Sequence, residues 1–560
     1  MAEQLDFIIV GASVAGLASG IALKKSGHRV LVVEKAAGLG EGRPTIPYGC
    51  ARIPPNGSKI LSHWGLDKHI SALQYQTTSP GFAVFRYEGR GEGQDLMGLQ
   101  SYDEEMLSEA QGQYLTLRHV DLIHILYNEF LRPMDPPSSV ASLDKSRIQV
   151  RFNAEVTSID LEACSVTLQN GEQLTADAII GADGPNGVVR AALKREEDEE
   201  RKARATDDGD FWLDSDSESE DSQADKENVS LLVYSATVPK SAMRDHPALA
   251  GLLSYNHSAF FGANRAAFVY SVGDNLSCCI YSPEDGPTSK ITDILGPVCD
   301  SGIRSLALVA DSSNKSLHSS GRPLQEHEPL QSWVSESGRV VVLGEAAHPF
   351  PAGAVNSYAC ALEDSVFIGK IFSHTHDRSR IPELLYAFQE HREPRCNLLC
   401  DIDMKYVTSL TQDDEDTYIT RDAMFRTNYQ QGKNVMEIPE SHEGQTMEET
   451  RMLFSYDAGD DADEWWINWG RFHDFAVRSQ EDTCDENGDG ELERLPQWQW
   501  SQDSDEGSTC WFTDGCDEST PRPGQSFHIN INAEVEEDET NWLTVYDGST
   551  RRKREVDAKD

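Results

Sequence analysis

The chain has 560 residues, which is too long for one hydrophobic core and predicts two or three domains. Its formal net charge of −45 argues against nucleic acid or anionic lipid as a partner, because both carry the same sign. The acid is concentrated in residues 196–227, in 411–416 and from about 435 onward. Together with a mean hydropathy of −0.50, this distribution predicts that part of the chain is disordered.

The cysteine content is typical of an intracellular protein. There are 11 cysteines, an odd number, and the apolar N-terminus lacks the basic start and cleavage site of a secretory signal. We therefore expect reduced thiols in a soluble, cytoplasmic protein with no transmembrane span. No cysteine spacing predicts zinc, and a calcium-loop-like segment beginning at Asp485 has Pro496 where a bidentate Glu is required. No metal site is predicted.

Residues 5–35 predict a strand, a glycine turn, a helix and a second strand. Residues 7–10 form the β-branched, apolar run of a strand buried on both faces, and Gly11 then turns the chain. The helix is expected to end at Lys25, and Glu34 lies at the carboxyl end of the second strand. Such a unit directs a helix N-terminus at a pyrophosphate and a carboxylate at a ribose hydroxyl.

The glycine fingerprint of this unit is imperfect. The pattern G-x-G-x-x-G appears as Gly11-x-Ser13-x-x-Gly16, with serine in place of the middle glycine. A β-α-β unit that binds no nucleotide is the alternative at this point. The strand before the turn, the helix after it and the acid at Glu34 favour nucleotide binding.

The rest of the chain divides into segments of different composition. After the opening unit we expect α/β structure with part of a second sheet near 80–115, an acidic disordered insertion, a β-sheet layer, a return to α/β structure, a helical extension and an acidic, largely disordered tail. The predicted boundaries are 1–193, 194–228, 229–334, 335–408, 409–477 and 478–560.

Two later segments each place an acid after a buried strand and a glycine-bearing turn. Residues 179–190 contain Asp183 and Gly184, and residues 338–349 contain Glu345. A carboxylate in such a position can accept hydrogen bonds from ribose or ribityl hydroxyls. Three well-spaced segments of this sort do not fit a simple NAD dehydrogenase.

With these three segments the chain resembles the FAD-dependent aromatic hydroxylases (group A flavoprotein monooxygenases), particularly fungal salicylate-hydroxylase-like members. A fourth motif, Leu117-Arg118-x-x-Asp121-Leu122, supports the resemblance, which covers roughly residues 5–400 without 194–228. The resemblance implies an α/β fold with a Rossmann-type FAD-binding domain, made of 1–193 and 335–408, and an inserted antiparallel substrate-binding sheet. The acidic segments would remain disordered.

The resemblance also implies ligands and residue roles. NAD(P)H would reduce FAD, and O2 would then form a flavin C4a-hydroperoxide that hydroxylates a small aromatic or polyketide-like substrate. Tyr270 and His348 are the candidate catalytic residues, against a packed strand tyrosine and a histidine that only fixes its loop. The residues implied in FAD binding are Gly11, Ser13, Gly16, Glu34, Gly49, Arg118, Asp183, Gly184, Glu345 and Tyr358.

Several positions depart from the family pattern. The family's Asp is Glu345, its usual Ser is Gly187, and its Gly-Gln-Gly turn is replaced by Val355-Asn356-Ser357. Ser235 stands where some members carry an arginine on the substrate sheet. These departures keep open a catalytically impaired flavin-binding protein that acts through its acidic insert and tail. An oxidase or epoxidase on the same scaffold, a homodimer, and either NADH or NADPH also stay open.

Overall fold

The computed structural model describes residues 4–39, 50–90, 94–133, 148–207, 231–243, 249–283, 290–312, 317–318, 322–324, 327–437, 450–471, 499–501 and 509–511. The chain divides into two compact units, residues 1–469 and 470–560. In the second unit, strands β19 (Gln499–Ser501) and β20 (Thr509–Trp511) pair in antiparallel fashion. None of the described helices is long and apolar enough to cross a membrane.

A five-stranded parallel sheet forms the core of the nucleotide-binding part of the first unit. Its strand order is β18-β11-β1-β2-β7, and all four neighbouring pairs are parallel. Except for the edge strand β7, the strands read as nearly continuous apolar runs because both faces of the sheet are covered. Helices α1 (Val14–Lys25) and α9 (Ser357–His374) pack against each other beside it. The strands are β1 (Asp6–Val10), β2 (Arg29–Val33), β7 (Ile148–Arg151), β11 (Ala178–Gly181) and β18 (Val340–Val342).

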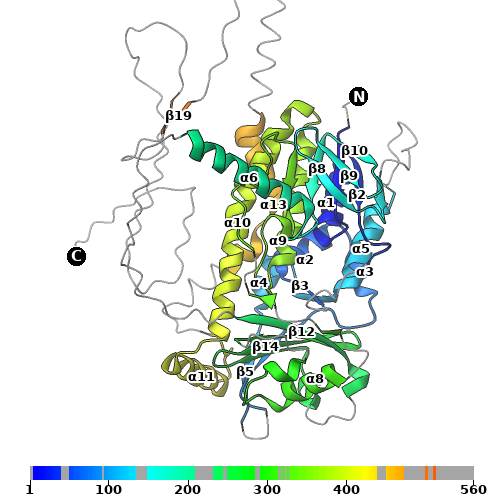
Figure 1. Ribbon diagram of the computed structural model, residues 1–560. Helices are drawn as coiled ribbons and strands as arrows, with labels where there is room; N and C mark the ends of the chain where they lie inside the picture. Colours follow the sequence, from blue (N-terminus) through cyan, green and yellow to red (C-terminus); the bar gives the residue numbers. More distant parts are fainter. Residues whose placement is uncertain are drawn as a thin grey trace, which may run out of the picture. The chain divides into compact units, whose positions relative to one another are not determined.

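An eight-stranded sheet forms a second layer. Its order is β16-β12-β15-β14-β13-β4-β5, with β17 also paired to β12, and only the β13–β4 pair is parallel. Its members are β4 (Gly81–Arg86), β5 (Leu96–Ser101), β12 (Leu232–Pro239), β13 (His257–Phe261), β14 (Ala266–Val272), β15 (Asn275–Ser282), β16 (Leu317–His318) and β17 (Arg322–Pro323). Helix α8 (Ser301–Ser312) packs on one face. Figure 1 shows this layer between α8 and the nucleotide-binding part.

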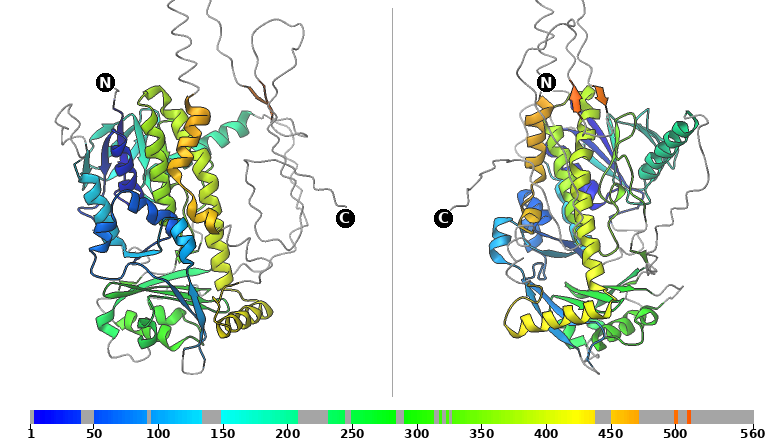
Figure 2. Two further views of the ribbon diagram at one scale, coloured as in Figure 1. Left: turned by 180° about the vertical axis from the view of Figure 1, so that it is seen from behind. Right: turned by 90° about the vertical axis from the view of Figure 1, so that its left-hand side faces the viewer.

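Elements between the two sheets position the site. The short antiparallel pair β3 (Cys50–Ile53) and β6 (Leu115–Arg118) lies there, followed by α2 (Pro55–His63). The long helix α10 (Ile381–Leu410) runs past both layers, as both views in Figure 2 show. Helix α11 (Glu415–Gln430) follows it and packs on β5.

The structure corrects the predicted extent of disorder. Helix α6 (Val188–Asp207) continues through residues 194–207, which we expected to be unstructured. This stretch is rich in good helix formers, and the ion pairs Lys194–Glu197 and Arg201–Asp198 lie three residues apart along it. Residues 208–228 lie outside the described residues. Within the predicted tail, β19 and β20 are strands that each carry a tryptophan, a residue with high strand propensity.

Candidate functional site

The glycine turn after β1 is closely packed. Gly11 has φ +103°, and a Cβ at Gly16 would lie 2.0 Å from the Gly11 carbonyl oxygen, so both positions require glycine. Ser13 is the N-cap of α1. Its hydroxyl accepts a hydrogen bond from the Gly16 amide at 3.1 Å and donates to the Ala182 carbonyl at 2.9 Å. The serine that breaks the fingerprint therefore joins the first nucleotide segment to the second.

Glu34 lies beside this turn, as predicted. Its carboxylate accepts hydrogen bonds from the Ala12 amide at 2.7 Å and the Ala36 amide at 3.0 Å, and the residue is only 5% exposed. These bonds fix the turn to the end of β2. Contact with a ribose stays a prediction for Glu34.

Asp183 has one oxygen committed to the fold and one without a partner. Its Oδ2 accepts from the Val188 amide at 2.6 Å at the start of α6, whereas its buried Oδ1 has no hydrogen-bond partner among the described residues. Burial raises the pKa of this carboxyl. A Cβ at Gly187 would lie 2.1 Å from Oδ1, so glycine at this position leaves room for the carboxylate.

A cavity of about 430 Å³ lies where the three nucleotide segments meet. Of the predicted cofactor-binding residues, the structure places five in its lining: Ser13, Asp183, Gly184, Glu345 and Tyr358. Gly11, Gly16 and Glu34 form the turn behind the lining. The volume is within the usual range of ligand sites, roughly 300–1,000 Å³.

Two predicted cofactor residues are placed neither in this lining nor in the turn behind it. Gly49 lies outside the described residues. The Arg118 guanidinium instead binds the Asp121 carboxylate, with its Nε 2.6 Å from Oδ2. The neighbouring residue, His119, does line the cavity, and its Nδ1 lies 2.9 Å from the Tyr358 hydroxyl. A role in cofactor binding stays a prediction for Arg118.

The N-terminus of α9, which carries the predicted cofactor residue Tyr358, is held by a buried carboxylate. Asp403 of α10 accepts from the amides of Val355 at 3.1 Å and Asn356 at 2.9 Å. Burial raises the pKa of Asp403 to about 6, although these hydrogen bonds and the charge of Arg52 oppose the rise. Apart from Gly353, with φ +86°, the loop from 353 to 357 needs no positive φ.

A second, smaller pocket of about 70 Å³ lies against the eight-stranded sheet. Six of its fourteen lining residues are phenylalanine or tyrosine, among them Tyr270 of β14. The Tyr270 hydroxyl accepts a hydrogen bond from Arg52 Nη1 at 2.7 Å. Ser235, which stands where some members carry an arginine, is buried on β12. The arginine near Tyr270 is therefore Arg52 of β3. Arg52 lines both this pocket and the larger cavity.

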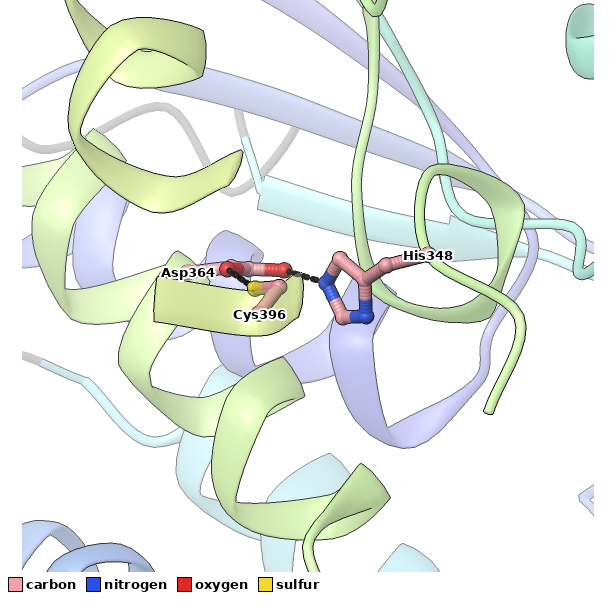
Figure 3. A group of neighbouring side chains, drawn as sticks. All are labelled: His348, Asp364 and Cys396. Carbon is pink, nitrogen blue, oxygen red and sulfur yellow. Dashed lines mark hydrogen bonds and ion pairs between the residues drawn. The ribbon is translucent and has the colours of Figure 1, made fainter. Parts of the chain in front are cut away.

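His348 belongs to a buried cluster, shown in Figure 3 with Asp364 and Cys396. His348 Nε2 lies 2.6 Å from Asp364 Oδ2, which also accepts from the Gly344 amide at 2.9 Å. Asp364 Oδ1 accepts from Arg392 Nε at 2.9 Å. Burial lowers the pKa of His348, but the neighbouring acidic groups outweigh it, so the pKa is raised. His348 does not line the cavity, and the geometry suits the alternative that this histidine fixes its loop.

The same cluster has the ligand types of a metal site. The ligand atoms of His348, Asp364 and Cys396 lie within 4.8 Å of one another. The Arg392 guanidinium, however, contacts both Asp364 and Glu363, and its positive charge opposes a cation there. The bonds to Arg392, His348 and Gly344 account for both oxygens of Asp364 without a metal.

Sequence reasoning missed three residues of the site: Arg52, His119 and Asp403. The signal for Arg52 is a charged residue within the otherwise apolar run of residues 50–53, ahead of a Pro-Pro helix start. His119 follows the predicted Arg118 directly. No local pattern marks Asp403, because it lies on a long helix and reaches the loop only in the folded chain.

The donor set fits FAD. The first amides of α1, at the cavity-lining residues Val14 and Ala15, have no acceptor within the helix and can receive a pyrophosphate. The unpartnered Asp183 Oδ1 can accept from a ligand hydroxyl. The cavity therefore offers donors for the phosphates and an acceptor for a sugar or ribityl chain.

Comparison with known proteins agrees with this geometry. Residues 5–220 match the family described as pyridine nucleotide-disulphide oxidoreductase. FAD-dependent monooxygenase OpS4 of Beauveria bassiana is 25% identical over 436 residues, which cover 76% of this chain and 90% of OpS4. Hispidin-3-hydroxylase of Neonothopanus nambi is 27% identical over 198 residues, or 35% and 41% of the two chains. The chain is a relative of the FAD-dependent monooxygenases.

Solved structures of low identity share the fold. FqzB superposes with a TM-score of 0.59 at 18% identity, over 86% of this chain and 96% of FqzB. CtdE in complex with FAD and a substrate gives 0.57 at 16% identity, over 83% and 98%. The predicted α/β fold with a Rossmann-type sheet is confirmed, as is the resemblance to FAD-dependent monooxygenases of aromatic-hydroxylase type. The sequence relatives, which are named FAD-dependent monooxygenases, support FAD as the cofactor.

Proposed function

We propose that this protein is an FAD-dependent monooxygenase that uses NAD(P)H and O2 to hydroxylate a small aromatic or polyketide-like substrate. The observation that carries the proposal is the cavity at which all three nucleotide segments meet, with the aromatic pocket next to it. Bound FAD would supply the electron transfer from NAD(P)H and the activation of O2. The alternative of a catalytically impaired flavin-binding protein is not favoured, because OpS4 is a named monooxygenase that aligns over most of both chains.

Within this proposal, residues 1–193 and 335–408 bind the cofactor and residues 229–334 supply the substrate layer. The parallel sheet and the cavity support the first assignment. The antiparallel strands β12 to β15 support the second, and they carry Tyr270 and other lining residues of the aromatic pocket. We further propose a cytoplasmic protein; a homodimer is compatible with this function.

The chain's own residues would act by binding and orientation. Ser13 joins the first nucleotide segment to the second, Asp183 binds the Val188 amide at the start of α6, and the α1 N-terminus receives the phosphates. Asp403 and Arg52 fix the loop that precedes α9. The aromatic side chains of the small pocket exclude water from the place where one edge of the substrate ring would lie.

Two measurements test the proposal on the full chain. Purified protein incubated with FAD and then desalted should retain the visible flavin absorbance. With NADH or NADPH, isotope-labelled O2 and a panel of aromatic compounds, mass spectrometry should find one labelled oxygen atom in an organic product. Flavin binding with peroxide as the sole product across the panel would contradict the monooxygenase assignment. Failure to retain FAD after desalting would contradict it in the first of the two measurements.

A further inference from the structure

Arg52 is a buried cation located between the two pockets. The residue is 6% exposed, and its strand β3 lies between the two sheets. Its Nη1 donates to the Tyr270 hydroxyl at 2.7 Å, and its Nη2 donates to the carbonyls of Gly353 at 2.6 Å and Ala354 at 2.7 Å. The guanidinium also lies over the Tyr270 ring, 5.0 Å from its centroid. Its orientation is therefore fixed before any ligand binds.

This guanidinium lacks an anionic partner in the part of the chain that the structure describes. Its hydrogen bonds there use three of the five N–H donors and reach only neutral oxygens. By contrast, the buried Arg392 contacts the carboxylates of both Glu363 and Asp364. A buried charge is costly unless an opposite charge or a full set of hydrogen bonds compensates it. The two remaining donors and the unbalanced charge suit a negatively charged ligand group.

The surroundings favour an aromatic ligand. The small pocket is lined by Phe82, Tyr102, Tyr114, Phe268, Tyr270 and Tyr406 among others. Burial raises the pKa of each of the four tyrosines. Burial and the charge of Arg52 lower the pKa of His257 to about 4. These groups are neutral near pH 7, which leaves Arg52 as the one charged side chain among the lining residues.

The other nearby charge does not neutralise Arg52. Asp403 lies close enough for Arg52 to lower its pKa, but its carboxylate accepts from the Val355 and Asn356 amides and forms no ion pair with Arg52. At about 70 Å³ the pocket is smaller than the cavity of about 150 Å³ that holds benzene in another protein. An acidic group with the adjoining ring edge fits this space better than a fused ring system.

We propose that Arg52 anchors the substrate, and that the substrate is an aromatic compound carrying a carboxylate or an ionised phenol. Charge-assisted hydrogen bonds from the two remaining N–H donors would hold the acidic group. Tyr270 would act as a positioning residue that sets the guanidinium plane. This inference rests on the proposed function only in calling the ligand a substrate. The binding preference itself can be measured without turnover.

Benzoate and benzamide test the proposal, because they match in shape and differ in charge. Their dissociation constants are measured on the FAD-loaded full chain from perturbation of the flavin spectrum, and on FAD-free protein by calorimetry. Wild type should bind benzoate more tightly by about tenfold or more. Arg52→Gln should abolish this preference, and Arg52→Lys should retain part of it. Arg190→Gln is the matched control, since Arg190 is also buried and bound to three carbonyls but lines neither pocket.

The outcomes separate this inference from the proposed function. Equal binding of the two probes by wild type, or a benzoate preference that survives Arg52→Gln, overturns the anchor. If Arg52→Gln shifts the flavin reduction potential and leaves the preference intact, the guanidinium serves the flavin and the anchor is again overturned. Failure of the protein to retain FAD or to form product contradicts the proposed function alone, because calorimetry on FAD-free protein still reports the preference.

Discussion

Replacing Asp403 with asparagine should make the stability difference from wild type depend on pH. Burial raises the pKa of Asp403 from 3.8 to about 6 in the folded chain. Between these values the folded state holds a proton that the unfolded state has released, so stability falls as pH rises through this window. The full shift corresponds to about 3 kcal/mol, of which about 2 kcal/mol is lost between about pH 4.5 and about pH 7.5. The side-chain amide in the Asp403→Asn variant cannot titrate, so this variant should escape the loss.

The assay is urea unfolding of both proteins at the two pH values. Comparison of each variant with wild type at the same pH cancels the response of the other acidic residues. Relative to wild type, Asp403→Asn should gain about 2 kcal/mol on going from the lower to the higher pH. Asp401→Asn removes one charge from the exposed side of the same helix and is the matched control. A stability difference for Asp403→Asn that is equal at both pH values would refute the reasoning.

Three further substitutions test the framework of the site. Gly16→Ala places a Cβ 2.0 Å from the Gly11 carbonyl oxygen, so we expect a loss of stability of about 1–3 kcal/mol from overpacking and reduced FAD retention. Unchanged FAD content would show that the backbone of the turn can shift to accommodate the methyl group. Glu34→Ala should lose FAD, measured by flavin absorbance per protein, and should cost about 1–3 kcal/mol because the Ala12 and Ala36 amides lose their acceptor. Full FAD occupancy in the folded variant would disprove the ribose assignment. Arg392→Met removes the guanidinium shared by Glu363 and Asp364, leaving Arg395 on Glu363 and His348 on Asp364, and should cost about 3 kcal/mol in urea unfolding. A loss below about 1 kcal/mol would mean that Arg395 and His348 suffice to balance the two carboxylates.

The cofactor part of the site could be predicted because its residues lie in short, continuous stretches of sequence. The run from Phe7 to Glu34 dictates its own turn, helix and strand through local periodicity and glycine placement. The placement of Asp183 and Glu345 follows from the rule that ligands bind at the carboxyl ends of parallel strands. Arg52 could not be assigned in this way, because its significance depends on Tyr270, which lies 218 residues away.

The prediction of disorder was wrong for residues 194–207, again because the decisive contacts are distant in sequence. High charge predicts poor burial, but α6 begins in buried residues such as Val189 and Leu193 and extends outward from them. The carboxylate of Glu197 also accepts from the amides of Gln331 at 2.7 Å and Ser332 at 2.9 Å. Glu196 likewise accepts from the Glu336 amide at 3.2 Å. Two acids thus tie the charged helix to segments that are distant in sequence, which composition cannot reveal.

The departures from the family pattern at 355–357 lie in a segment that two buried charged side chains, Arg52 and Asp403, hold in place. Glycines in the family's Gly-Gln-Gly turn give the backbone a freedom that Val355-Asn356-Ser357 lacks. Val355 to Ser357 instead adopt ordinary φ values, and positive φ is needed only at Gly353. Arg52 binds the carbonyls of Gly353 and Ala354, while Asp403 binds the amides of Val355 and Asn356. A cation on the carbonyl side and a carboxylate on the amide side thus hold one segment, so its position depends on two buried charges where glycine would have allowed movement.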